Sequence, residues 1–172
     1  MSIPRQQRNT VFGFGEGEAE IVFLKHLQAI YAPPRLITVR LRPAGGKSPG
    51  YILTKAIRVR GNVTYDHSFI LLDTDIQWTG ALKGKARGAG FELIGSAPCI
   101  EGLFLSILNP GVNHAGRSSS ACKKEFQGTH LRATRTINDK DCRRLFTKAE
   151  LDKLRAQIPR LHRLIEIMEG SF

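Results

Sequence analysis

The sequence lacks the features that mark secreted, membrane-spanning and disulfide-stabilised proteins. It contains three cysteines, Cys99, Cys122 and Cys142, which lie far apart without C-x-x-C spacing. An odd number of scattered cysteines argues against a disulfide framework or a structural zinc site, and it suits a reducing cytoplasm. The first ten residues have no apolar core of a signal peptide, and no apolar run approaches the ~20 residues of a membrane span. We therefore expect a cytoplasmic protein that does not associate with a membrane.

Acidic residues are scarce relative to basic ones. The 172 residues include 26 Lys and Arg against 15 Asp and Glu, so the net charge is +11 at pH 7. This excess favours a polyanionic partner, with nucleic acid the first candidate. Residues 117–163 alone carry 13 Lys and Arg against 5 Asp and Glu, and this basic third would contact a nucleic-acid backbone without reading its sequence. A solvated basic face that only keeps the protein soluble is the alternative.

Apolar runs alternate with helical patterns through the first half of the chain, which is typical of a parallel α/β sheet flanked by helices. Strands are expected at residues 10–15, 35–43, 67–75 and 91–98. Helices are expected before Pro33 and at about residues 51–59, 79–88 and 99–108. Residues 1–109 would form this core, and residues 110–172 a polar loop and a basic helical extension packed on it. The extension would end in one long helix that begins at a Thr147 capping box and is kinked at Pro159.

A glycine turn follows the first expected strand, in the segment TVFGFGEGEAEIVFLKHL. Gly13 and Gly15 match the first two positions of the dinucleotide-binding pattern G-x-G-x-x-G, but Glu18 occupies the third. Carboxylates beside a helix N-terminus suit the helix dipole and would repel a pyrophosphate. The turn is therefore interpreted as a sharp strand-to-helix connection that presents Glu16, and not as a nucleotide site.

Carboxylates follow two of the expected strands. Glu16 lies just past the first strand, and Asp73 and Asp75 end the strand HSFILLDTD, where alternation would put both on one face. Ligands of open parallel sheets bind outside the carboxyl ends of the strands, so these side chains would meet at one rim and bind Mg²⁺ or Mn²⁺. The alternative is structural. Glu18 and Glu20 would then be first-turn partners of the helix dipole, and one aspartate a cap or turn residue.

The same segments, in order, resemble the RloB-like family of Toprim-related bacterial proteins, which are associated with phage defence and restriction loci. The resemblance rests on GEGEAEIVFLKHL, GGKSP, YDHSFILLDTD, GSAPCIEGLFLSIL and CKKEF, and it covers residues 10–127. An acidic E-G motif after the first strand and a D-x-D after a later strand is the Toprim arrangement. The resemblance therefore implies a Toprim-like, Rossmann-like fold with a mostly parallel sheet.

The resemblance also implies roles for four carboxylates. Glu16 is similar to the Toprim glutamate, a metal ligand or general acid/base, and Asp73 and Asp75 are similar to the metal-binding pair. Glu101, in the context SAPCIE, is similar to a family glutamate that completes the acidic site or orients a ligand. The implied cofactor is Mg²⁺ or Mn²⁺. The implied activity is phosphodiester hydrolysis of nucleic acid by a Toprim-type nuclease in bacterial defence.

Basic residues near these motifs are candidate contacts for nucleic-acid phosphates. The candidates are Lys47, Arg117, Lys123 and Lys124, although solvated loop lysines are more common. His114, in the polar loop, is the histidine most open to a functional role. The rival interpretation is a non-catalytic subunit of a defence assembly, which binds nucleic acid or acts as a scaffold together with protein partners of that system.

Overall fold

Four parallel strands form the central sheet in the part of the chain that the structure describes. The computed structural model describes residues 8–131 and 136–172. The strands are β1 (Asn9–Gly15), β2 (Ile37–Pro43), β3 (His67–Asp73) and β4 (Glu92–Ser96), in the order β2-β1-β3-β4. Every neighbouring pair of strands is parallel. The predicted α/β class, with a parallel sheet and flanking helices, is confirmed.

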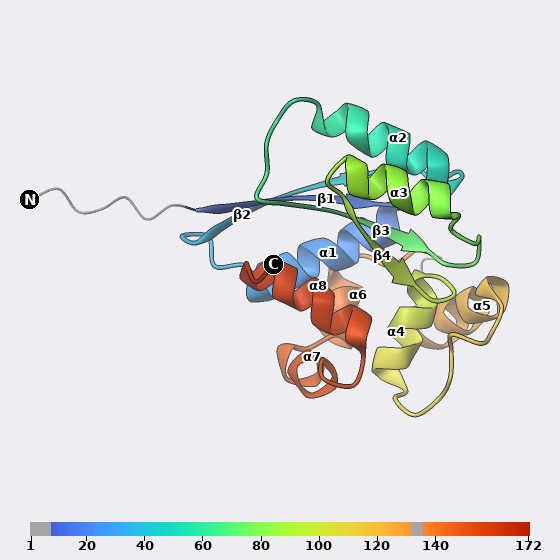
Figure 1. Ribbon diagram of the computed structural model, residues 1–172. Coiled ribbons are helices and arrows are strands. Elements are labelled where there is room, and N and C mark those ends of the chain that lie inside the picture. Colours follow the sequence, from blue (N-terminus) through green and yellow to red (C-terminus); the bar gives the residue numbers. More distant parts are fainter. Residues whose placement is uncertain (1–7, 132–135) are drawn as a thin grey trace, which may run out of the picture.

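Helices cover both faces of the sheet (Figure 1). On one face lie α2 (Pro49–Arg60) and α3 (Gly80–Gly88), which we call the upper layer. The other face carries the lower layer, which consists of α1 (Glu18–Tyr31), α4 (Ile100–Leu108), α5 (Ser119–His130), α6 (Asp139–Leu145), α7 (Lys148–Leu154) and α8 (Pro159–Glu169). Within the described ranges, no helix is both long enough and apolar enough to cross a membrane.

The chain reverses its direction across the sheet between β1 and β3. From β1 it passes through α1 to β2, and it then returns through α2 to β3 on the other side of β1. Because crossovers between parallel strands are right-handed, this reversal places α1 and α2 on opposite faces. In open parallel sheets such a switch point opens a crevice at the carboxyl ends of the strands, where ligands bind. The fold thus marks the ends of β1 and β3 as the position of a site.

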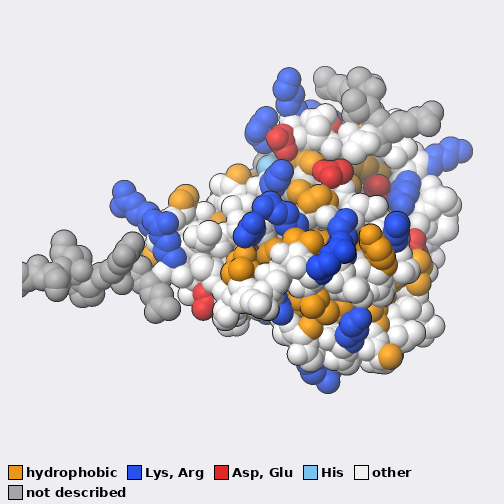
Figure 2. All heavy atoms as spheres, turned by 90° about the horizontal axis from the view of Figure 1, so that it is seen from above, with side chains coloured by type: hydrophobic (Ala, Val, Ile, Leu, Met, Phe, Trp, Pro, Cys, Tyr) orange, Lys and Arg blue, Asp and Glu red, His pale blue; other side chains and the backbone are white. Residues whose placement is uncertain are grey.

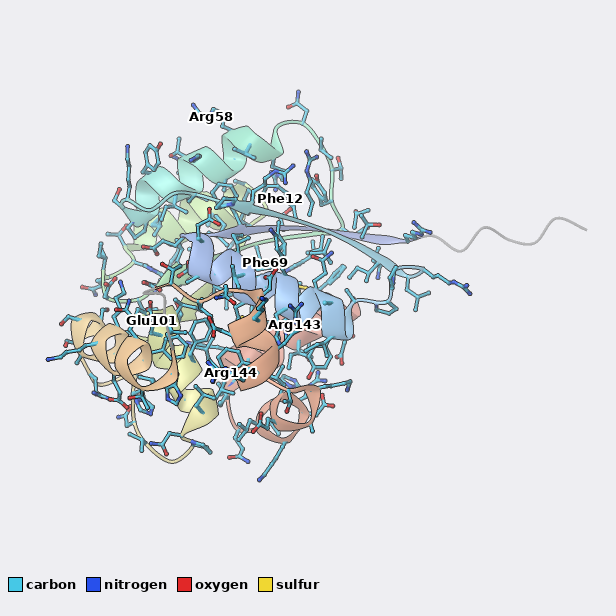
Figure 3. The ribbon with its side chains drawn as sticks, turned by 180° about the vertical axis from the view of Figure 1, so that it is seen from behind. Phe12, Arg58, Phe69, Glu101, Arg143 and Arg144 are labelled. Atoms are coloured by element: carbon cyan, nitrogen blue, oxygen red, sulfur yellow. The ribbon has the colours of Figure 1, made fainter. Side chains whose placement is uncertain are left out.

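Two hydrophobic clusters hold the helical layers to the sheet. Among the described residues, the lower cluster contains 31 buried side chains and the upper cluster ten. Phe12 belongs to the upper cluster and Phe69 to the lower one, on either side of the sheet (Figure 3). Gly13 on β1 lets Leu41 and Phe69 pack closely over it, since a Cβ at this position would lie 2.6 Å from Leu41 and 2.7 Å from Phe69. A side chain here would force the neighbouring strands' core residues apart.

The C-terminal segment differs from its prediction in the number of helices. The capping box formed by Thr147 and Glu150 is present and begins α7. The expected single kinked helix is wrong, because α7 ends at Leu154 and Pro159 is the first residue of a separate helix, α8. Proline fits a first helical turn and disfavours helical angles in the preceding residue, so Ile158 is extended. The helix α6 lies in a segment for which the sequence pattern predicts none.

Candidate functional site

An acidic rim lies at the switch point, beside the carboxyl ends of β1 and β3. We use this name for the carboxylates of Glu16, Glu20, Asp73, Asp75 and Glu101. Glu16 follows β1 directly, and its backbone N–H continues the ladder by donating to the Leu71 carbonyl at 3.1 Å. Its Oε2 accepts a hydrogen bond from the Asp73 N–H at 3.0 Å, and burial raises the pKa of Glu16 despite this bond. One carboxylate thus joins the ends of two adjacent strands.

Asp73, the last residue of β3, is only 7% exposed. Its Oδ1 accepts from Ser96 Oγ at 2.8 Å and from the Ile100 N–H at 3.0 Å. Ser96 stands directly opposite on β4. Burial and the charges of Glu20 and Glu16 raise the pKa of Asp73 to about 8, although the Ser96 hydroxyl acts in the opposite direction. A neighbouring cation would stabilise the ionised form of a carboxylate in these surroundings more than that of an exposed carboxylate.

Glu20 belongs to the rim, although its place in the sequence indicates only a first-turn partner of the helix dipole. Its Oε2 accepts from the Gly17 N–H at 2.8 Å at the start of α1. The residue is 4% exposed, and burial raises its pKa to about 7 despite this hydrogen bond. Glu16 and Glu101 add repulsion. The usual sequence signature of this cap has Ser or Thr at the position of Gly17, so the sequence pattern does not reveal it.

Asp75 lies outside the strand, contrary to the expectation that one strand face would carry both aspartates. β3 ends two residues earlier, and the Thr74 N–H turns to the carbonyls of Ser96 and Pro98 at 2.9 and 3.0 Å. Asp75 is therefore exposed, and its Oδ2 accepts from Ser119 Oγ on α5 at 3.1 Å. The turn splits the D-x-D motif into one buried and one exposed carboxylate.

Glu101 and Lys123 reach the rim from the lower layer. Glu101 stands in the first turn of α4, close to α5 (Figure 3), and its Oε2 is buried without a hydrogen-bond partner among the described residues. Partial desolvation acts to lower the pKa of Lys123 on α5, but Glu101 and Asp73 outweigh it and raise this pKa. Lys123 is therefore an ammonium group placed among carboxylates.

Lys47 and Lys124 are exposed candidates for phosphate contact. Lys124 follows Lys123 on α5. Lys47 precedes α2, and its ammonium lies 4.6 Å from the centre of the Tyr51 ring. The neighbouring Gly46 N–H donates to the Glu16 carbonyl at 2.8 Å. The loop that carries Lys47 is thus hydrogen-bonded to the backbone of the rim.

Arg117 and His114 lie in the loop before α5, and they contact each other. Arg117 forms an ion pair with Glu125, and its Nη1 lies 3.3 Å from Nδ1 of His114. His114 is 1% exposed, and within the described chain its Nε2 is buried without a hydrogen-bond partner. Its polar surroundings in the sequence suggest an accessible loop residue, whereas the ring lies inside the lower layer. The charge of Arg117 is compensated by Glu125 before any ligand binds.

The donor atoms of the rim suit a hard divalent cation. Carboxylate oxygens are the side-chain ligands that Mg²⁺ and Mn²⁺ prefer. Within the described residues, however, no three His, Cys, Asp or Glu side chains converge into a ready cage for a metal ion. Mg²⁺ usually binds through one or two carboxylates and completes its shell with water and substrate phosphate. Glu16 and Asp73, at the neighbouring ends of β1 and β3, offer that number of carboxylates.

Comparison with protein-family models, with curated proteins and with solved structures yields no match to this chain. The resemblance to RloB-like proteins, and the roles that it implies for the rim carboxylates, therefore remain predictions. The parallel fold and the position of the rim at its switch point are properties of the chain itself. They are the basis for the function proposed below.

Proposed function

We propose that the acidic rim binds Mg²⁺ or Mn²⁺ and hydrolyses phosphodiester bonds of nucleic acid, in the manner of a Toprim-type nuclease. One observation carries the proposal: Glu16 and Asp73 stand at the ends of two adjacent parallel strands, where such sheets bind ligands, and the Glu16 carboxylate accepts from the Asp73 N–H. The raised pKa values of Glu16 and Asp73 support it, because desolvated and crowded carboxylates gain most from a cation. The net charge of +11 supports a polyanionic substrate.

Two carboxylates at the strand ends hold the cation in this proposal. Glu16 and Asp73 bind it from the strand ends, and Asp75 is available from the exposed side of the rim. When bound, Mg²⁺ or Mn²⁺ would lower the pKa of a water molecule and balance the charge of the phosphate. The close approach of two strand ends keeps these ligands in position before substrate arrives.

Three further residues would stabilise charge on the phosphate or take up a proton during the reaction. The Lys123 ammonium stabilises negative charge that develops on the phosphate oxygens, and Glu101 positions Lys123 through their electrostatic attraction. Glu20 has a pKa of about 7, so it holds or releases a proton close to neutral pH. It lies beside Glu16 and would store a proton that leaves the rim during the reaction.

Metal titration with nucleic-acid cleavage tests the proposal. We expect Mg²⁺- or Mn²⁺-dependent nicking that is slowed roughly 100-fold or more in Asp73→Asn. Asparagine keeps an oxygen that can accept from Ser96 and Ile100 but has no negative charge. Lys25→Gln, an exposed substitution on α1, is the control and should cleave as the wild type does. Wild-type protein that is inert with all metals and with both DNA and RNA would rule the proposal out.

Thermal unfolding provides a readout that does not depend on turnover. A cation that binds only the folded state raises the Tm by mass action. We expect Mg²⁺ or Mn²⁺ to raise the Tm of the wild type and to have little effect on Asp73→Asn. A Tm that responds equally to these ions in both proteins would show that the rim is not the metal site.

A non-catalytic nucleic-acid-binding subunit is the second candidate. It is favoured by the hydrogen bonds that already engage the rim, from Ser96 to Asp73 and from Ser119 to Asp75. In this reading the carboxylates fix the strand ends and α5, and the protein acts through partners of a defence or restriction assembly. It predicts binding without cleavage, unchanged in Asp73→Asn. Either function would be exercised in the cytoplasm, where the three unpaired, buried cysteines stay reduced.

A further inference from the structure

The segments that form the upper layer contain Lys and Arg but no acidic residue. Residues 44–65 and 76–91, which contain α2, α3 and their flanking loops, include seven Lys and Arg and no Asp or Glu. Figure 2 looks down on this layer: Lys and Arg side chains are spread across it, and the acidic side chains in view lie toward its margins. These segments therefore contribute seven positive charges and no negative charge to the net charge of +11.

The lower layer, in contrast, pairs many of its cations with carboxylates. Among the described residues, the Lys and Arg pairs within this layer are Arg117–Glu125, Arg144–Asp141, Lys148–Asp152, Arg155–Glu169 and Arg163–Glu166, and Arg163 also pairs with Glu92 on β4. In residues 8–131 and 136–172 no ion pair includes a residue of α2 or α3. Five of the 13 Lys and Arg in residues 117–163 thus form ion pairs within the described ranges.

Cations of the upper layer face the solvent. Arg58 projects from α2 away from the sheet (Figure 3), and Lys83 and Arg87 are exposed on α3. Arg60 is anchored, because its Nη2 donates to the Ala89 carbonyl at 2.7 Å. A neutral carbonyl orients the guanidinium without cancelling its charge. The layer therefore combines solvent-exposed cations with one cation that is anchored by a hydrogen bond.

We infer that the upper layer is a docking surface for the phosphate backbone of a nucleic-acid duplex. The 12 residues of α2 make it about 18 Å long, which spans about five base-pair steps at about 3.4 Å each. Lys85 on α3 donates to Thr54 Oγ1 on α2 at 3.0 Å, so the cations of both helices form one surface. These charges complement phosphates, and the release of condensed counterions favours their binding.

The side chains of the upper layer favour a duplex over a single strand. Proteins that bind single strands stack the bases on aromatic rings within a basic groove. Among the described residues of this layer, Tyr51 is the aromatic side chain that is largely exposed, at 41%, and the Lys47 ammonium already lies over its ring. Contact between Lys or Arg and the backbone, without base stacking, positions a duplex and does not read its sequence.

The docking surface begins beside the acidic rim. In parallel βα units each helix starts near the carboxyl end of the strand before it, so the N-terminal ends of α2 and α3 lie on the rim side of the sheet. The loop before α2 is bonded to the rim through Gly46 and Glu16. A duplex along α2 would bring a phosphate to the rim. This last consequence rests on the proposed function, whereas the docking itself does not.

Equilibrium binding in EDTA tests the docking surface separately from any chemistry at the rim. The probe is a fluorescent duplex of about 20 base pairs and mixed sequence, made as DNA and as RNA, with the matching single strands, measured over a range of salt. The test variant combines Arg58→Gln, Lys83→Gln and Arg87→Gln. The matched control combines Lys140→Gln, Arg143→Gln and Lys153→Gln, which removes three exposed cations from the lower layer. Circular dichroism melting establishes that both variants fold.

We expect the upper-layer variant to bind the duplex roughly tenfold more weakly or worse, with a salt-dependence slope smaller by about three, since each phosphate contact contributes ~0.9. The control variant should bind as the wild type does. Equal losses in both variants would overturn the inference. So would tighter binding of the single strand, or binding of polyglutamate or anionic vesicles without the duplex. Duplex binding that meets these expectations in a protein without cleavage would uphold the docking surface and reject the proposed function.

Discussion

The two helical layers of this protein differ in what their side chains do. The lower layer packs on a cluster of 31 buried residues and pairs cations such as Arg155 and Arg163 with carboxylates. The upper layer packs on ten buried residues, and in the described chain its cations have no acidic partners. Burial stabilises a fold in rough proportion to apolar area. The lower layer therefore supplies most of the stability, and the upper layer can carry concentrated charge.

Removal of a core ring from the lower layer should have the largest effect. Phe104 is fully buried, and its ring centre lies 5.1 Å from those of Phe23, Phe126 and Phe146. We expect Phe104→Ala to lower the free energy of unfolding by about 4 kcal/mol, through lost burial and the cavity left behind. Urea unfolding followed by circular dichroism measures it. Phe104→Leu should lose less than half as much; a loss below about 1 kcal/mol in Phe104→Ala would contradict the role of the lower cluster.

The acidic rim lies at the edge of the sheet between the two layers. A substitution of Asp73 tests whether this carboxylate stabilises the fold. Its pKa is raised to about 8 from 3.8, so its contribution to stability is complete below pH 3.8 and is lost as the pH rises through about 8. Asp73→Asn removes the charge. Above pH 8 we expect the free energy of unfolding of Asp73→Asn to exceed that of the wild type by on the order of 2 kcal/mol. Near pH 3.8 the two proteins should differ little in stability.

This comparison is made by urea unfolding in EDTA, so that divalent ions do not stabilise the wild type. Asp139→Asn, an exposed substitution at the start of α6, is a control for general charge effects. An Asp73→Asn protein that is less stable than the wild type at every pH would mean that the carboxylate serves the fold, as the scaffold interpretation requires.

Glu92 on β4 forms an ion pair with Arg163 of the lower layer, and this pair should stabilise the fold. Its two oxygens accept from Arg163 Nε and Nη2 at 2.9 Å each, and His67 Nε2 lies 3.0 Å away. His67 and Arg163 lower the pKa of Glu92 to about 2 against the effect of burial. The stabilisation that the ionised Glu92 gives to the folded state is therefore present above pH 4.5, and it is lost as the pH falls through about 2. We expect Glu92→Gln to lose about 1 kcal/mol at pH 7 and almost nothing at the acid end of a urea-unfolding series. A pH-independent loss would contradict the pairing.

Arg58 in the upper layer should have the smallest effect on stability. Its side chain is exposed on α2, so Arg58→Gln should change the free energy of unfolding by less than about 0.5 kcal/mol. Arg163→Gln in the lower layer should lose about 1 kcal/mol, because it leaves Glu92 without its bidentate partner. Parallel urea titrations of the two variants measure the contrast. Equal losses would mean that upper-layer cations support the fold and that the two layers do not differ as described.

The local sequence pattern predicts the elements whose hydrophobic and capping residues have the same role in the folded protein. The apolar run from Phe69 to Leu72 indicates a strand covered on both faces, and β3 is one. The capping box at Thr147 begins a helix, as such boxes do. Glu16 and Asp73 follow neighbouring parallel strands, so the topology alone brings them together.

Other features depend on tertiary contacts that no local pattern encodes. Asp75 leaves the strand face because the Thr74 N–H bonds to carbonyls more than 20 residues away. Glu20 belongs to the rim because packing desolvates it, whereas its sequence context is that of an ordinary helix start. The pairing of Arg155 with Glu169 requires α7 and α8 to be separate helices that fold back on each other. The location of uncompensated charge could therefore not be predicted from composition.

The hydrogen bond from Ser119 to Asp75 joins positions 44 residues apart in the chain. A unit cut after residue 109 would retain the carboxylates at its strand ends and would lose both Ser119 and Lys123. Anyone who wished to transplant the rim onto another parallel sheet would have to move two pieces, a pair of strand ends and one helix. The smallest portable form of the site is thus discontinuous in sequence, and a host scaffold would need an open flank on which to seat that helix.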